Sequence, residues 1–266
     1  MAVAYDTLGS GEVTGSTMNL SWTHVCTGSN LLLLVFIEHQ NTSASVSSVT
    51  YNGVSMTQLQ RNDHTDSLYA FYLVAPATGS HTVAVTMGSA TNDISGISQS
   101  YTGVSQTSPI DNSAKASSGS PSIVVAGGRS WLSAAISGIS TSGNPSSSGY
   151  TLRTDLGAGG HNIGTLDSNG IVSNGTNSPV FIWDAGSVDS TVIVSIAAQT
   201  TAYPADLSVG TFALTGFNAG ITHARNAVTT VGVFTVTTYN ATITWVSNKW
   251  KFSAKNSTSW TNSPKT

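Results

Sequence analysis

The densest group of side chains that could do chemistry is the run Arg61-Asn62-Asp63-His64-Thr65-Asp66. Asp63 and Asp66, together with nearby carbonyl groups, offer the oxygen ligands that Ca²⁺ prefers. The run lacks the spacing and the closing glutamate of an EF-hand loop. We therefore favour a solvated hairpin loop between Met56 and Leu68, and a calcium site remains the alternative.

Other potentially catalytic residues are scattered along the chain. The six histidines show neither HxxxH nor HxH spacing, so their positions predict no zinc site. Glu12 and Glu38 are the two glutamates, and no local motif pairs either with an aspartate for glycoside hydrolysis. No Gly-x-Ser-x-Gly motif follows a strand and opens a helix, and Gly157–Gly160 lacks the lysine of a phosphate loop. These patterns predict no enzyme and no cofactor, and a polysaccharide-degrading enzyme is our least favoured hypothesis.

The tryptophans fall into two groups. Trp22, Trp131 and Trp183 lie in strand-like runs, and we expect them in the core rather than on a sugar-binding platform. Trp245, Trp250 and Trp260 lie instead among lysines in a segment with little else that is apolar. Large aromatic rings in a polar segment are expected to be covered, and tryptophan anchors are common at interfaces. We favour a partner subunit as the cover, with the adjoining repeats or a stacked glycan as alternatives.

A short repeat precedes this tail. Gly210–Thr222 recurs as Gly232–Thr244, with matching Gly, Phe, Thr, Asn, Ala and Ile at equal offsets. Each copy predicts two short strands around a tight turn, and such a unit is too small to bury its own apolar face. We therefore expect the repeats and the tail to form a partner interface. The residues expected at that interface are Phe212, Phe217, Phe234, Tyr239, Trp245, Lys249, Trp250, Lys251 and Trp260.

Composition limits the remaining function classes. Charged residues make up 8% of the chain, whereas about 25% is typical. Residues 1–206 have a balance of −8 and residues 207–266 one of +5, which together return the net charge of −3. Five basic residues in this end segment fall short of a DNA-binding stripe, so we expect docking on an acidic protein surface and no nucleic-acid partner. The single cysteine, Cys26, excludes an intrachain disulfide and is expected to be a small buried group.

The elements that must position these residues are predicted to be strands, because Val, Ile, Thr, Ser and Gly dominate the chain. Asn52-Gly53 predicts a type I′ turn within a hairpin. Ser140–Ser148 and Gly157–Gly160 are predicted loops, and Pro76–Gly79 is a predicted turn. The predicted strands are Leu31–Ile37 (buried on both faces), Val49–Tyr51, Val54–Met56, Leu68–Val74, His81–Met87, Ile94–Tyr101, Ser122–Ala126, Trp131–Ile136, Val180–Asp184 and Val188–Ala197.

These elements predict an all-β fold, an antiparallel β-sandwich of jelly-roll type over residues 1–200. A linker at 201–208, a two-copy β-repeat module at 209–248 and a polar, basic tail at 249–266 are expected to follow. The start of the chain has no signal-peptide pattern, and its longest apolar run is too short to span a membrane. We therefore expect synthesis in a host cytoplasm and no membrane span.

Four segments carry a resemblance to known proteins. They are Val49–Val54, Tyr72–Gly79, Val83–Thr86 and Tyr101–Asp111. As a set they resemble a β-sandwich domain of phage and bacterial virion or surface proteins, from about Asn30 to Ala198. The repeats are similar to short β modules at the ends of phage structural proteins. This resemblance implies a virion or surface role and neither a ligand nor a catalytic residue.

We therefore predict a phage virion structural protein that is not an enzyme, best described as an exterior capsid decoration protein anchored by its C-terminal module. Its expected partners are other capsid or tail subunits and copies of itself. The alternative is a carbohydrate-binding adhesin or a tail-fibre-associated module that binds a host-surface glycan. A single pair of repeats departs from the longer arrays of fibre proteins.

Overall fold

The computed structural model describes residues 2–40, 43–158 and 160–199. The chain divides into two units after Thr201, and the described residues all belong to the first unit. The predicted linker, repeat module and tail lie outside the described residues. So do all the predicted interface residues, which are Phe212, Phe217, Phe234, Tyr239, Trp245, Lys249, Trp250, Lys251 and Trp260.

The described part consists of strands and their connections and contains no helix. Every strand pair that it contains is antiparallel, so the predicted all-β antiparallel sandwich is confirmed for these residues. The strands are β1 Ala4–Cys26, β2 Leu32–His39, β3 Val46–Tyr51, β4 Val54–Ser55, β5 Thr57–Asp63, β6 Ser67–Val74, β7 Gly79–Thr102, β8 Ile110–Ala116, β9 Ile123–Val125, β10 Trp131–Ser146, β11 Thr151–Ala158, β12 His161–Asp167, β13 Gly175–Asn177 and β14 Ile182–Ile196.

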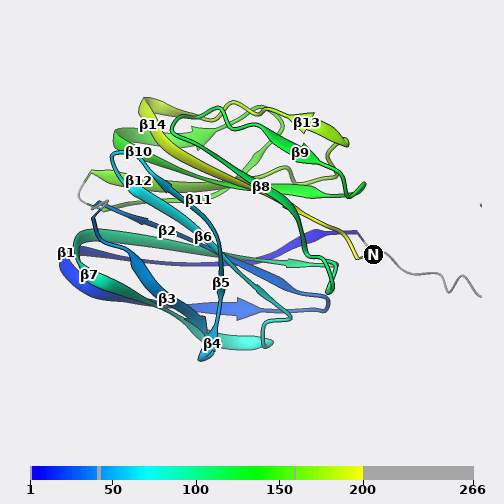
Figure 1. The fold of residues 1–266 in the computed structure, drawn as a ribbon, viewed down its shortest axis with the longest axis horizontal. Coiled ribbons are helices and arrows are strands. Elements are labelled where there is room, and N and C mark those ends of the chain that lie inside the picture. Colours follow the sequence, from blue (N-terminus) through cyan, green and yellow to red (C-terminus); the bar gives the residue numbers. More distant parts are fainter. Residues whose placement is uncertain (1, 41–42, 159, 200–266) are drawn as a thin grey trace, which may run out of the picture. The chain divides into compact units, whose positions relative to one another are not determined.

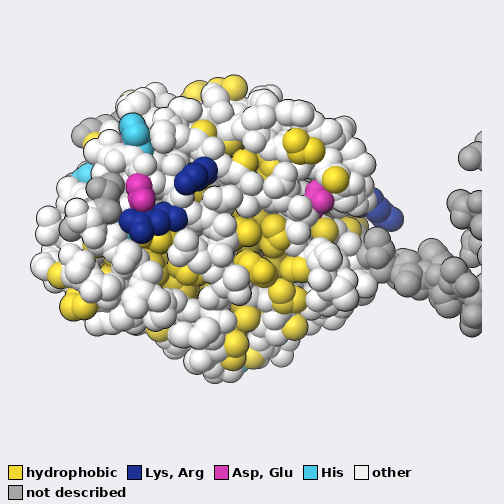
Figure 2. All heavy atoms as spheres, viewed as in Figure 1, with side chains coloured by type: hydrophobic (Ala, Val, Ile, Leu, Met, Phe, Trp, Pro, Cys, Tyr) yellow, Lys and Arg dark blue, Asp and Glu magenta, His cyan; other side chains and the backbone are white. Residues whose placement is uncertain are grey.

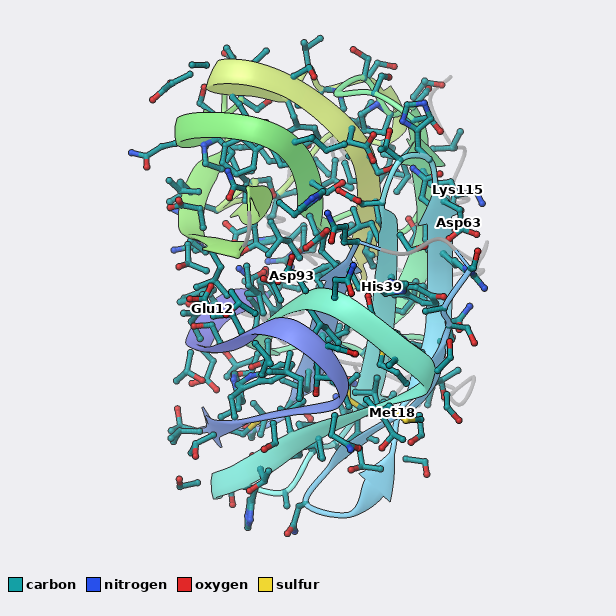
Figure 3. The ribbon with its side chains drawn as sticks, turned by 90° about the vertical axis from the view of Figure 1, so that its left-hand side faces the viewer. Glu12, Met18, His39, Asp63, Asp93 and Lys115 are labelled. Atoms are coloured by element: carbon teal, nitrogen blue, oxygen red, sulfur yellow. The ribbon has the colours of Figure 1, made fainter. Side chains whose placement is uncertain are left out.

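The first sheet has the order β4-β3-β7-β2-β6-β5, with β1 also paired to β7, and it folds back over itself. β1 and β7 pair along nearly their whole length, and their register shifts between Thr14 and Thr17. Gly15 lies there at a φ of 87° and donates its N–H to Asp93 Oδ1 at 3.0 Å. The two strands bend together at this point, close to the labelled Glu12 and Asp93 in Figure 3. The bend gives the sheet two layers. One layer contains β3, β4 and one half of each long strand, and the other contains β2, β5, β6 and the remaining halves.

The second sheet has the order β11-β12-β10-β14-β8 and packs against the first, and the small β9-β13 sheet covers its outer face. Figure 1 shows these layers stacked from β9 and β13 at the top to β3 and β4 at the bottom. Within the described residues, three apolar cores fill the spaces between the layers. A pleated strand presents alternate residues to opposite faces, and β2 uses both faces. Leu33, Val35 and Ile37 enter the core within the first sheet, while Leu32, Leu34 and Phe36 enter the core between the two sheets.

Several local predictions are confirmed. The hairpin joins β3 to β4 through Asn52 and Gly53, whose φ values of 52° and 76° fit a type I′ turn. Trp22, Trp131, Trp183 and Cys26 are all buried. Val192, Val194 and Ile196 share one core, as their alternation along the strand predicts.

Other predictions are wrong because paired strands run on through polar sequence. The segments His81–Met87 and Ile94–Tyr101 are predicted as two strands, but both belong to the single bent strand β7. The predicted loop Ser140–Ser148 is largely strand, because β10 continues to Ser146 beside β14. The segments Val180–Asp184 and Val188–Ala197 likewise belong to one strand, β14. The backbone hydrogen bonds of a ladder do not depend on side-chain type, so polar stretches can stay in the sheet.

Candidate functional site

Three ionisable side chains meet between the two sheets, at one end of the core that joins them. Glu38 is near the end of β2, Asp66 directly precedes β6, and His161 begins β12. Side chains two positions apart along a strand lie on the same face. Glu38 therefore shares a face with Phe36, Asp66 shares one with Leu68, and His161 shares one with Ile163. These three apolar residues lie in the core between the sheets, which explains why the polar side chains converge there.

The cluster is tight and almost fully removed from water. One ligand atom from each of Glu38, Asp66 and His161 lies within 4.8 Å of those of the other two. Glu38 and Asp66 are each 1% exposed and His161 is 9% exposed. His161 Nδ1 is 2.7 Å from Asp66 Oδ2, and His161 Nε2 is 2.6 Å from Gln40 Nε2. The Gln40 amide therefore donates to Nε2, and Nδ1–H donates to the Asp66 carboxylate.

The two carboxyl groups are poorly satisfied within the described part of the chain. Glu38 Oε1 and Asp66 Oδ1 are buried and have no hydrogen-bond partner there. Burial, reinforced by Asp66, Asp93 and Asp189, raises the pKa of Glu38 well above its usual value. Burial also raises the pKa of Asp66, although the hydrogen bond with His161 opposes that rise. The cluster is thus a place where a proton or a cation would relieve a buried negative charge.

The hairpin that carries Asp66 is fixed by a carboxylate from the second sheet. Asp189 on β14 accepts hydrogen bonds from the backbone N–H groups of Thr65 and Asp66 at 3.3 and 3.2 Å. Its Oδ1 also lies 2.7 Å from His64 Nδ1. Burial alone would raise the pKa of Asp189, but these hydrogen bonds outweigh it and lower the pKa. The turn therefore presents Asp66 inward in a defined conformation.

The structure separates the two aspartates that the sequence suggests as calcium ligands. Asp63 accepts hydrogen bonds from Arg61 Nε and Ser67 Oγ, both at 2.7 Å, and takes no part in the buried cluster. It lies near Lys115 at one edge of Figure 3. The favoured hairpin is present between β5 and β6, but it is not solvated throughout, because Asp66 is buried.

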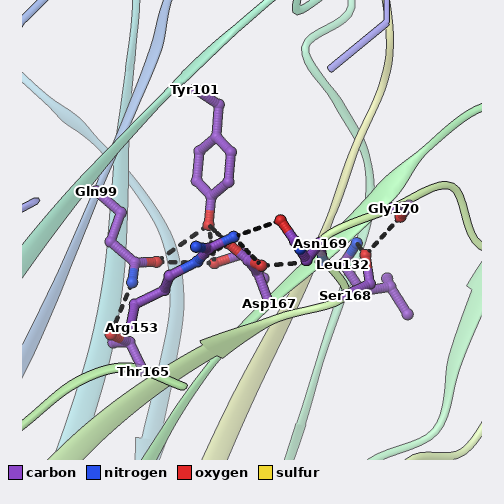
Figure 4. Close-up of polar contacts among 10 residues, drawn as sticks. Gln99, Tyr101, Leu132, Arg153, Thr165, Asp167, Ser168, Asn169 and Gly170 are labelled. Carbon is purple, nitrogen blue, oxygen red and sulfur yellow. Dashed lines mark hydrogen bonds and ion pairs between the residues drawn. The ribbon is translucent and has the colours of Figure 1, made fainter. Parts of the chain in front are cut away.

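A second polar network joins the two sheets at the other end of their shared core (Figure 4). Arg153 on β11 makes two hydrogen bonds to the Asp167 carboxylate, at 2.7 and 2.8 Å. Asp167 also contacts the Tyr101 hydroxyl at 3.2 Å, and Gln99 donates to Thr165 Oγ1 at 2.7 Å. Tyr101 and Gln99 belong to the first sheet and the others to the second, so this network links the sheets.

Two hollows of the described surface lie away from the buried cluster. One of about 300 Å³ is lined by Tyr150, Ser168, Asn177 and neighbouring residues, and one of about 360 Å³ lies beside Trp183. Both are in the region of the outer layer, and neither is lined by the buried cluster. Among the described residues, no helix has the length and apolar character needed to cross a membrane.

Comparison with known proteins gives no relative from which a function could be transferred. No family model, no curated protein and no solved structure matches the chain. Its function must therefore be inferred from its own residues.

Sequence reasoning missed the buried cluster. Its members come from three separate elements, and Asp66 and His161 are 95 residues apart. One signal was available: Glu38 directly follows an apolar run that is predicted to be buried on both faces. A carboxylate on such a strand needs a partner inside the protein, although the sequence does not show which one.

Proposed function

We propose that this chain is a structural protein of a bacteriophage virion, an exterior capsid decoration protein anchored by its C-terminal module. The observation that carries the proposal is how the described part uses its buried polar groups. They connect the first sheet to the second. The Tyr101 hydroxyl contacts the Asp167 carboxylate, and the Asp66 backbone N–H donates to the Asp189 carboxylate. Groups arranged in this way support a durable scaffold.

The described surface also suits a scaffold. Figure 2 shows a face on which charged side chains are few and most of the surface belongs to uncharged groups. Several ionisable groups that the sequence does contain are buried, among them Glu38, Asp66, Asp167 and Asp189. A surface of Ser, Thr, Gly and Asn relies little on net charge for solubility and fits a protein held within an assembly.

The C-terminal sequence supports the anchoring part of the proposal. A stable, specific contact needs about 1,200 Å² or more of total buried surface, and two hairpins with an aromatic tail could supply it. Exposed strand edges also invite pairing with a strand of another subunit. Closed symmetry, such as that of a trimer or a capsid-imposed multimer, would cover those edges.

A deletion tests the proposal. The chain without residues 207–266 is expected to keep a cooperative, β-sheet-rich fold by circular dichroism and to stay monomeric. It is also expected to be missing from virions when it is supplied in place of the full chain. The control is a full-length protein with the same expression tag. Incorporation of the truncated protein at the level of the full chain would refute the anchor.

The second candidate is a glycan-binding adhesin, and one hollow favours it. Tyr150 packs edge-on against Phe181, at a ring separation of 5.1 Å, beside a polar rim that includes Ser148 and Asn177. Glycan sites combine an aromatic surface with amide and hydroxyl groups. Saturable binding of one glycan class by residues 1–200 on a glycan array would favour the adhesin, and absence of binding would leave the scaffold as the better account.

A further inference from the structure

We propose that Glu38, Asp66 and His161 form a binding site for a divalent transition-metal ion of the zinc type. The ion would join β2 and the β5–β6 hairpin of the first sheet to β12 of the second. This role goes beyond the proposed scaffold function and does not depend on it, because it follows from the geometry of three buried side chains.

The donor set selects the class of metal. It contains one imidazole nitrogen and two carboxylates, with one donor atom from each residue within 4.8 Å of the others. Zn²⁺ accepts both nitrogen and carboxylate oxygen at about 2.0–2.2 Å and is usually four-coordinate. Ca²⁺ prefers six to eight oxygen atoms and Mg²⁺ an octahedron of oxygens, so an imidazole donor disfavours both. Three protein ligands would leave one tetrahedral position for water.

The unpartnered oxygens indicate that the cluster lacks a positive group. Glu38 Oε1 and Asp66 Oδ1 are both buried without a hydrogen-bond donor from the described residues. Leaving such acceptors unpaired in an interior is unfavourable, and more so when they are charged. Asp93 and Asp189 add further negative charge to the surroundings of Glu38. A divalent cation would satisfy both oxygens at once, whereas a proton on Glu38 would supply a single donor.

Gln40 is placed as the outer partner of a metal-binding histidine. Its amide is 2.6 Å from His161 Nε2, while Nδ1 faces Asp66. A metal-bound histidine usually donates its other ring N–H to a carbonyl or carboxylate. An amide can reverse its oxygen and nitrogen in the same position. In that state Gln40 Oε1 would accept Nε2–H, and Nδ1 would be free to bind the metal.

The experiment uses the full, tag-free chain after removal of metals with EDTA. Zn²⁺ alone is then added, and we measure the zinc content per chain, the affinity by calorimetry and the thermal midpoint. We expect one zinc ion per chain. We also expect the midpoint to rise by about 5–10 °C at a free zinc concentration one hundred times Kd.

Variants locate the site. Glu38→Gln and His161→Gln should each weaken zinc binding at least tenfold and abolish most of the rise in midpoint. Gln40→Ala should weaken binding by about 10–100-fold, as loss of an outer partner does. Asp63→Asn, which changes a nearby carboxylate outside the cluster, should bind zinc as the original chain does. Circular dichroism in EDTA checks that each variant is folded. If one of the two ligand variants does not fold, the other still tests the site.

Three outcomes would overturn the proposal. The original chain could take up no zinc, or Glu38→Gln could bind it as tightly as the original chain. Ca²⁺ could also bind more tightly than Zn²⁺, which would contradict the transition-metal assignment. If Glu38 is simply a protonated acid, Glu38→Gln will be at least as stable as the original chain in EDTA, and zinc will raise neither midpoint.

Discussion

Among the described residues, most buried polar side chains are held by specific partners, many of them from distant strands. His24 is 1% exposed, with Nδ1 2.9 Å from Ser98 Oγ and Nε2 3.3 Å from Thr7 Oγ1. Ser98 also accepts a hydrogen bond from Trp22 Nε1 at 2.8 Å. Hydroxyl groups can donate or accept, so such a network accommodates a neutral imidazole. Burial lowers the pKa of His24 to about 4, which makes the neutral form the native one.

This environment predicts a loss of stability in acid. In the unfolded chain His24 takes up a proton near pH 6.5, but in the folded chain it does so only near pH 4. Between these values the unfolded state binds more protons, so the free energy of unfolding should fall as the pH falls. The full loss is about 3 kcal/mol for this residue. Urea unfolding of the original chain and of His24→Gln at pH 7 and pH 4.5 measures it. The variant should lose less stability, and equal losses would contradict the assignment.

The bent pair β1 and β7 is the element that gives the first sheet its two layers. Close approach between its two layers requires a small residue. A Cβ added to Gly96 on β7 would lie 2.4 Å from Trp22 Cη2 and 3.1 Å from Ile37 Cδ1. The Trp22 ring of β1 thus packs directly on the Gly96 backbone within the core.

Gly96→Ala is therefore expected to destabilise the protein by overpacking, by about 1–3 kcal/mol. Trp22 would have to shift, which would strain its hydrogen bond to Ser98. The matched control is Gly170→Ala, because a Cβ there meets only Ser168 O at 3.7 Å. Chemical denaturation of both variants checks the difference. Equal midpoints would show that the core around Trp22 can relax.

The two sheets should behave as one cooperative unit because polar links flank their shared apolar core. Glu38, Asp66 and His161 lie at one end, and Tyr101, Asp167 and Arg153 at the other. Asp167 forms an ion pair with Arg153. The Asp167 side chain is fully buried, and the Arg153 side chain is only 14% exposed. Arg153 also stacks on Tyr5 of β1, with the guanidinium carbon 3.9 Å from the ring centroid.

Arg153→Met should destabilise the protein by about 3–5 kcal/mol, since it leaves the Asp167 carboxylate buried without its cation. The double change Arg153→Met with Asp167→Asn should recover part of that loss. Arg61→Met, which breaks a more exposed pair with Asp63, should lose only about 1 kcal/mol. Urea denaturation of the three variants tests this ranking. A loss at Arg153 no larger than that at Arg61 would mean that the buried link contributes little.

Features that depend on neighbouring residues could be predicted from the amino-acid sequence. Period-two alternation placed Val192, Val194 and Ile196 on one face, and Asn52-Gly53 specified a type I′ turn because both positions need a positive φ. The unbroken apolar run from Leu31 to Ile37 indicated a strand buried on both sides, and β2 is that strand.

Which strands are neighbours, and where polar residues meet, followed only from the folded arrangement. Two predicted strands are one strand, β7, because the polar stretch Gly88–Asp93 between them stays paired to β1 through the bend opposite Gly15. Glu38, Asp66 and His161 converge because β2 pairs with β6 and the second sheet packs on their shared face. Alternation fixes the face on which a side chain lies, but long-range pairing fixes what it meets there. That pairing depends on the packing of whole layers, which no local pattern in the chain records.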